Sequence, residues 1–151
     1  MKIFFKKQAG FSLIEFLMIV AMITIIAGIS SLIFKNIQPG LELKGLTREL
    51  ITDLRYTQQM AVTQQVDHGI QFLLSERRYQ VIKYQPTPEI LKEKTLPDEI
   101  EFLQITGFTA DKVKFNAYGA ASEAGEIIII ATKNGATTTI EVSPSGFVKS
   151  K

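Results

Sequence analysis

Residues 16–34 read FLMIVAMITIIAGISSLIF and contain no charged side chain. A helix of this length covers roughly 28 Å, since each residue adds about 1.5 Å, and the hydrocarbon core of a membrane is about 30 Å thick. Lys2, Lys6 and Lys7 precede this stretch, and positive residues tend to stay on the cytoplasmic side. We therefore expect one membrane-spanning helix over residues 11–34, with residues 1–10 in the cytoplasm and most of the chain translocated.

The charge pattern separates this N-terminal segment from the rest of the chain. Three of the 17 Lys and Arg residues precede the apolar stretch, and so does one of the 15 Asp and Glu residues, Glu15. The remainder of the chain therefore carries 14 positive and 14 negative residues. A balanced head of this kind does not predict strong attraction to polyanions. The absence of cysteine excludes disulfides, thiol catalysis and cysteine metal sites. A length of 151 residues allows one domain plus the N-terminal segment.

Two ordinary interpretations of the N-terminus explain less of it. A secretory signal peptide has an apolar core of about 7–15 residues followed by a small-residue cleavage site, whereas this stretch is longer and residues 27–30, AGIS, are a poor site. A plain anchor fits the length but gives no reason for Glu15. An acidic group costs on the order of 2–3 kcal/mol at the bilayer centre and less near an end, so Glu15 is a candidate functional residue.

The residues that lead into the apolar stretch resemble the leader and cleavage motif of type IV pilins and pseudopilins. They read KKQAGFSLIE from residue 6 to residue 15. The resemblance implies that a membrane-embedded prepilin peptidase cuts after Gly10 and methylates the new terminus, Phe11. Glycine suits the position because no side chain stands between its backbone and a protease.

The same resemblance implies a role for Glu15 as the fifth residue of the mature chain. In the family's filaments the helix of residues 11–34 would form the filament core, and this glutamate meets the N-terminal amine of a neighbouring subunit. Phe11 and Glu15 are four residues apart and so share one helical face. Because removing one member of a buried ion pair leaves the other uncompensated, Glu15 is expected to set the register of assembly.

Residues 35–66 are expected to continue the helix as an amphipathic segment. Pro39 and Gly40 predict a kink or a short break near Gln38. Beyond them the apolar residues recur at helical spacing, and the charged residues occupy mostly other faces. The apolar positions are Leu43, Leu46, Leu50, Leu54 and Ala61. This stripe predicts a helix over about residues 41–66 that packs on a sheet.

Residues 67–151 have the pattern of a β-rich head. Alternating residues and turn signals predict strands near residues 70–74, 79–84, 96–102, 113–116, 126–131, 137–142 and 146–149. Pro86, Pro88 and Pro97 predict an irregular connection after the first hairpin. Asn134 and Gly135 predict a type I′ turn, in which both central residues need positive φ.

One long helix followed by an antiparallel β-rich head is the α+β, pilin-like architecture. Within it the head resembles the GspH/FimT subgroup of minor pseudopilins and minor pilins, through the helix pattern, the hairpins and the terminal stretch GFV at 146–148. Many members carry Ala-Arg where this chain has Thr57 and Gln58. The resemblance implies a non-enzymatic filament subunit without a cofactor. Its partners would be the prepilin peptidase, other pilins or pseudopilins, and an assembly platform in the inner membrane.

Candidate catalytic and metal-binding residues are few. The single histidine, His68, follows Asp67 and is expected to be a solvated turn residue, because no nucleophile or second base accompanies it. Asp98, Glu99 and Glu101 could contribute oxygen ligands to a calcium ion, but they do not form a defined calcium loop.

DNA uptake is an alternative function, because some FimT-type minor pilins resemble DNA receptors that use arginines in the C-terminal tail. Here the tail reads GFVKSK from residue 146, and only Lys149 and Lys151 are cationic. Nonspecific DNA affinity needs several cations to neutralise phosphates, so nucleic acid is not an expected partner. A membrane-anchored receptor or enzyme is the other alternative. The sequence leaves open whether the filament belongs to type II secretion, a type IV pilus or a competence system.

Overall fold

The computed structural model describes residues 11–151, without the side chains of residues 30–36. The described chain contains one long helix and eight strands. It divides into two compact units, and the boundary along the chain lies between Ile37 and Gln38. The leader predicted for residues 1–10 lies outside the described residues, together with Lys2, Lys6, Lys7 and Gly10.

Helix α1 spans Leu13–Gln64. Pro39 lies inside it, and the helix runs through this position without interruption, so the short break predicted near Gln38 is wrong. A proline removes one backbone hydrogen bond and costs about 3 kcal/mol. A long helix tolerates that loss because every residue on both sides still adds a hydrogen bond.

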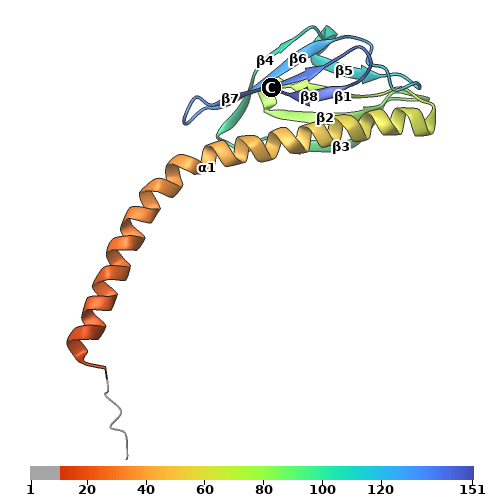
Figure 1. The fold of residues 1–151 in the computed structure, drawn as a ribbon. Coiled ribbons are helices and arrows are strands. Elements are labelled where there is room, and N and C mark those ends of the chain that lie inside the picture. Colours follow the sequence, from red (N-terminus) through yellow and green to blue (C-terminus); the bar gives the residue numbers. More distant parts are fainter. Residues whose placement is uncertain (1–10) are drawn as a thin grey trace, which may run out of the picture. The chain divides into compact units, whose positions relative to one another are not determined.

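In the second unit, the C-terminal part of α1 lies along the sheet that contains β2 and β3 (Figure 1). The predicted apolar stripe faces the core and its prediction is confirmed: Leu50, Leu54 and Ala61 are fully buried, and Leu43 and Leu46 are at most 5% exposed. Packing of this stripe, rather than helix propensity, stabilises an amphipathic helix.

Two four-stranded antiparallel sheets make up the head. The first has the order β3-β2-β1-β5 and consists of β1 (His68–Leu73), β2 (Arg78–Lys83), β3 (Glu89–Thr95) and β5 (Lys112–Phe115). The second has the order β4-β6-β7-β8 and consists of β4 (Ile100–Thr106), β6 (Gly125–Ala131), β7 (Thr137–Val142) and β8 (Val148–Ser150). The predicted architecture, a long helix packed on antiparallel sheets, is confirmed.

Side chains from both sheets and α1 form one core. Phe72 of β1 packs edge-on against Phe102 of β4, with ring centroids 5.2 Å apart. In the second sheet Ile127, Ile129 and Ile140 are fully buried, and their inward positions alternate with less buried ones along β6. The alternation that predicted these strands therefore marks the face toward the core.

Strand β3 was not predicted. Residues 89–95 were assigned to the irregular connection signalled by the prolines, yet they pair with β2 from Arg78 to Lys83. The strand lies at the edge of its sheet, and nearly all of its residues are exposed. An edge strand lacks the apolar alternation of a half-buried strand, and charged residues are common on such edges.

The hairpin of β6 and β7 is confirmed, but its turn is not of type I′. Gly135 has a φ of 68°, whereas Asn134 is not among the residues with positive φ. The amide of Gly135 donates to the Ala131 carbonyl at 2.9 Å, and Asn134 Oδ1 accepts from the amide of Ala136 at 3.0 Å. The asparagine therefore stabilises a longer loop by bonding to the backbone two residues on.

Leu54 allows a direct test of this packing. Replacing Leu54, which is fully buried, by alanine should lower the free energy of unfolding by about 2–5 kcal/mol, because it removes apolar contacts and leaves a cavity. Leu41→Ala is the matched control, since Leu41 is 58% exposed on the same helix and should change stability by less than about 0.5 kcal/mol. Urea denaturation of the full chain in detergent, followed by circular dichroism, measures both. Equal effects would contradict the packing.

Candidate functional site

The N-terminal part of α1 exposes its whole surface. Every residue from Phe11 to Ile29 is exposed, and Phe11 and Leu13 are more than three-quarters exposed. Thr24 satisfies its hydroxyl within the helix, where it donates to the carbonyls of Val20 and Ala21 at 3.1 and 2.8 Å. An apolar surface without an amphipathic pattern indicates a helix that other apolar groups cover on all sides.

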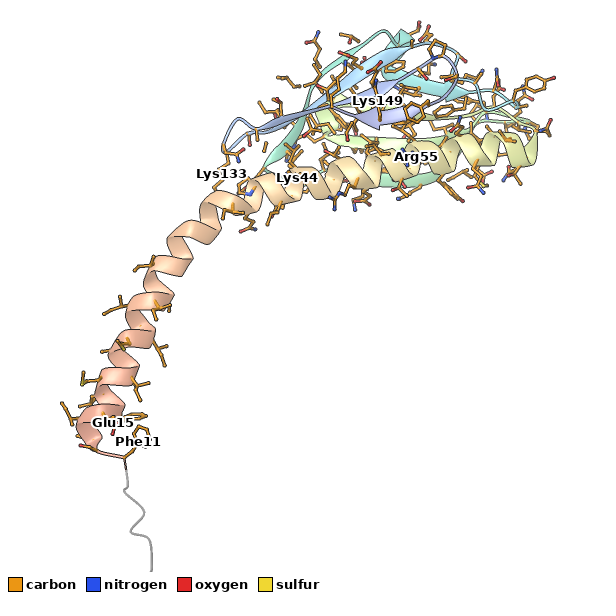
Figure 2. The ribbon with its side chains drawn as sticks, viewed as in Figure 1. Phe11, Glu15, Lys44, Arg55, Lys133 and Lys149 are labelled. Carbon is orange, nitrogen blue, oxygen red and sulfur yellow. The ribbon has the colours of Figure 1, made fainter. Side chains whose placement is uncertain are left out.

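Phe11 and Glu15 lie at the start of this helix (Figure 2). Glu15 is in the first turn, where the helix dipole stabilises a negative charge. Ser12 precedes the first helical residue, and Ser12 and Glu15 have the S-x-x-E spacing of a capping box. Glu15 can therefore stabilise the start of the helix, in addition to the assembly role that the resemblance implies. Gly10, on the other side of the predicted cut, lies outside the described residues.

The span predicted for residues 11–34 includes residues 30–34, whose side chains lie outside the described part of the structure. In the part of the chain that the structure describes, no helix is both long enough and apolar enough to cross a membrane.

The candidate DNA-binding lysines of the tail are engaged in ion pairs. Lys149 Nζ lies 3.2 Å from a Glu141 carboxylate oxygen, and Lys151 Nζ lies 3.3 Å from the same oxygen. Lys151 also lies 3.5 Å from Glu126. Hydrogen bonds from the two lysines lower the pKa of Glu141, and the Glu141 carboxylate raises the pKa of Lys151. Two glutamates therefore offset the positive charge of the tail, which does not favour DNA binding there.

A buried polar cluster on α1 was not predicted. Asp53 is 6% exposed and accepts a hydrogen bond from the Tyr79 hydroxyl at 2.6 Å. Lys92 Nζ donates to both Asp53 oxygens at 2.8 and 2.7 Å, and Lys94 donates to Glu49 at 2.9 Å. Burial and the hydrogen bond to Asp53 raise the pKa of Tyr79, which stays protonated. The cluster joins edge strand β3 to the helix.

The sequence contains a signal for this cluster. Leu46, Leu50, Asp53 and Thr57 recur at spacings of four, three and four, which places Asp53 on the buried face. The charged residues of this helix were expected mostly on other faces, and Asp53 is an exception. A carboxylate is stable at such a position only because a hydroxyl and an ammonium group satisfy it.

Asp53→Ala should lower the free energy of unfolding by about 2–3 kcal/mol, because it leaves the Tyr79 hydroxyl buried without a partner. Tyr79→Phe in the same chain should recover part of that loss, since it removes the orphaned group. Thr52→Ala, at the exposed neighbouring position, is the matched control. Denaturant unfolding of Asp53→Ala, Tyr79→Phe, the double variant and Thr52→Ala measures the coupling. Strictly additive losses would argue against the hydrogen bond.

His68 is not a solvated turn residue. It begins β1 and is fully buried, and its Nδ1 donates to the Val66 carbonyl at 2.7 Å. Its Nε2 has no hydrogen-bond partner among the described residues. Asp67 instead forms an ion pair with Lys114 at 2.9 Å. The expectation failed because β1 begins earlier than the alternation suggested and turns His68 toward the core.

The residues that depart from the subgroup pattern hold the end of the head together. Gln58 Nε2 donates to the Gly119 carbonyl at 2.6 Å, and Thr57 donates to the Asp53 carbonyl at 2.6 Å within the helix. Gly146, with a φ of 82°, lies so close that a side chain there would overlap the Gly119 carbonyl oxygen. Gln58 therefore ties the helix to a pair of packed loops.

The loop carboxylates considered for calcium lie in separate contacts. Asp98 pairs with Arg77 at 3.0 Å, and Glu99 pairs with Lys133 at 3.1 Å. Over residues 11–151, no three His, Asp or Glu side chains gather closely enough to hold a metal ion.

Comparison with solved structures finds the same fold in pilin-like proteins. The minor pseudopilin EpsH of the type 2 secretion system of Vibrio cholerae superimposes with a TM-score of 0.62 at 12% identity, over 73% of this chain and 96% of EpsH. The type IV minor pilin FimU of Pseudomonas aeruginosa superimposes with a TM-score of 0.58 at 17% identity, over 73% of this chain and 88% of FimU. At these identities the likeness shows the fold.

The sequence itself supplies the family. No curated protein matches the chain. Residues 46–146, about two-thirds of the chain, match the family described as type II transport protein GspH. This range runs from the buried stripe of α1 to the glycine that packs against Gly119. The chain is therefore a member of the GspH family of pilin-like proteins.

Proposed function

We propose that the chain is a minor subunit of a pseudopilus or a type IV pilus. A prepilin peptidase cuts it after Gly10, the helix of residues 11–34 holds it in the inner membrane, and the head of residues 67–151 lies outside the cytoplasm. The same helix then enters the filament. Membership of the GspH family and the fold shared with EpsH and FimU support a structural subunit rather than an enzyme.

The observation that carries the proposal is the exposed apolar surface of Phe11–Ile29. Burying one large apolar side chain is worth about 1.5–3 kcal/mol, so leaving more than ten in water is unfavourable by tens of kcal/mol. Lipid chains can cover this surface in the membrane, and neighbouring helices can cover it in a filament. The apolar stretch of the sequence continues to Phe34, which is long enough for a bilayer.

The proposed orientation in the membrane follows from the positive residues that precede the helix. Lys2, Lys6 and Lys7 precede the helix, and positive residues are retained on the cytoplasmic side. The peptidase therefore meets the leader at the cytoplasmic end of the helix. After cleavage, Phe11 carries the α-amino group that Glu15 of a neighbouring subunit can pair with.

The proposal assigns three kinds of partner. The prepilin peptidase acts on Gly10 and Phe11, other pilin-like subunits contact the helix, and the inner-membrane assembly platform extracts it. As the subunit leaves the membrane, helix contacts replace lipid contacts, so the apolar surface stays covered throughout. The head needs no cofactor in this role.

Intact-mass and N-terminal analysis tests the proposal. The full chain is expressed in the same host with and without a prepilin peptidase. A peptidase-dependent product that begins at methylated Phe11 is the expected result. An uncut chain, or a cut near Ser30, would overturn the assignment and leave the head as an anchored or secreted domain.

A further inference from the structure

A pocket opens between α1 and the end of the second sheet. It has a volume of about 320 Å³ and is lined by Lys44, Thr47, Arg48, Thr138, Ser150 and Lys151. Three of these six side chains are cationic, and the other three carry hydroxyl groups. Figure 2 shows Lys44 on α1, at the end of the head where Lys133 lies.

Two of the cations that line the pocket, Lys44 and Arg48, come from α1. Lys44 and Arg48 are four residues apart on one face of α1, where like charges destabilise a helix. Neither has an ion-pair partner among residues 11–151. Many other basic residues of the head are paired, including Arg77, Arg78, Lys92, Lys94, Lys114 and Lys133.

The third cation is held in place. Lys151 Nζ lies 3.3 Å from Glu141 and 3.5 Å from Glu126, and the Glu141 carboxylate raises its pKa. Lys151 is therefore held at the rim with its charge offset by glutamates, while Lys44 and Arg48 keep their donors available. Thr47 is buried and donates to the Leu43 carbonyl at 2.7 Å, so it forms part of the wall.

We propose that this pocket binds a single carboxylate side chain of a neighbouring pilin-like subunit. Arg48 offers two parallel N–H groups that match the two oxygens of a carboxylate, and Lys44 adds a point charge beside them. The contact fixes the head of one subunit against the next, independently of the N-terminal helix. The inference rests on the proposed function, because it requires a neighbour.

The surroundings favour a single carboxylate over a nucleic acid. A DNA strand needs a track of cations that neutralises several phosphates. Here Glu126 and Glu141 lie beside Lys151 and would repel phosphates that continue past the pocket. Thr138 and Ser150 also line the pocket, and their hydroxyl groups can donate hydrogen bonds to a carboxylate.

A zero-length carbodiimide cross-link tests the pocket in assembled filaments. The reagent joins a lysine amine to a carboxylate only when the two groups are in contact. In cells that assemble the full chain, mass spectrometry should find Lys44 coupled to an Asp or Glu of another subunit. Arg48→Ala should lower the yield of this product about tenfold, since a charge-assisted contact is lost. Lys83 has no ion-pair partner among the described residues, and Lys83→Ala should leave the yield unchanged.

A charge exchange makes the test specific. Arg48→Glu should reduce incorporation of the subunit, and changing the cross-linked carboxylate of the neighbour to lysine should restore it. Incorporated wild-type subunits that give no Lys44 cross-link would overturn the pocket but not the proposed function. A chain that enters no filament would overturn the proposed function itself. Binding of duplex DNA that depends on Arg48, together with normal assembly of Arg48→Glu, would assign the pocket to phosphate and refute the inference.

Discussion

Gly10→Val is expected to leave the leader on the chain, so that the subunit accumulates at its precursor mass and enters no filament. A protease must bring its catalytic groups against extended backbone, and glycine leaves that approach open. Valine adds a branched side chain at the residue whose carbonyl group belongs to the bond that is cut. The effect should be close to complete, because assembly requires the amino group that cleavage creates.

Ala9→Val is the matched control for this prediction. It introduces the same side chain one residue earlier, where the scissile bond is not involved, and should be cut normally. Intact-mass measurement after expression with a prepilin peptidase gives the cut fraction of each variant. Cleavage of Gly10→Val at the rate of the unaltered chain would remove the reason for glycine at this position.

Glu15→Gln should leave the subunit in the membrane but lower its incorporation into filaments by about tenfold or more. In a filament the Phe11 amine would lose its negative partner, and an uncompensated buried charge costs about 3–5 kcal/mol. Glutamine retains the size of the side chain. It also retains the ability to complete a capping box with Ser12, so the substitution isolates the charge.

Two controls separate the roles of Glu15. Glu15→Asp keeps the charge and should assemble better than Glu15→Gln. Glu42→Gln removes a charge from a later part of α1 and should assemble normally. The ratio of filament to membrane subunit, measured by quantitative immunoblotting, distinguishes them. Normal assembly of Glu15→Gln would mean that Glu15 acts only at the start of the helix.

The local sequence pattern correctly predicted those elements in which the spacing of apolar residues matches their burial on one face. The leucine stripe from Leu43 to Leu54 and the alternation of β6 both reflect burial on one face, and both are confirmed. Strand β3 was not predicted because it is an edge strand whose lysines form hydrogen bonds with the helix. Its apolar residues Ile90 and Leu91 are exposed and gave no period of two.

Features that depend on distant partners were beyond local reasoning. Asp53 can be buried because Tyr79 of β2 and Lys92 of β3 donate hydrogen bonds to its carboxylate. The sequence around Asp53 does not identify these partners. The carboxylate pocket likewise combines Lys44 and Arg48 with Lys151, which the fold brings together across about 100 positions. Phe11 and Glu15 were found because their signal, an ordered motif beside an apolar stretch, is itself local.

The last strand has a consequence for the order of events during export. Val148 of β8 is 1% exposed, and Arg55 of α1 donates to its carbonyl at 3.0 Å across 93 positions. Contacts this distant in sequence form late in folding. In the proposed topology the N-terminal helix enters the membrane first and β8 crosses after β1–β7, so the core cannot close until β8 has been translocated. A chain stalled before that point would present β7 as an open sheet edge, which invites aggregation. In this topology the head can be complete for assembly only after β8 has been translocated.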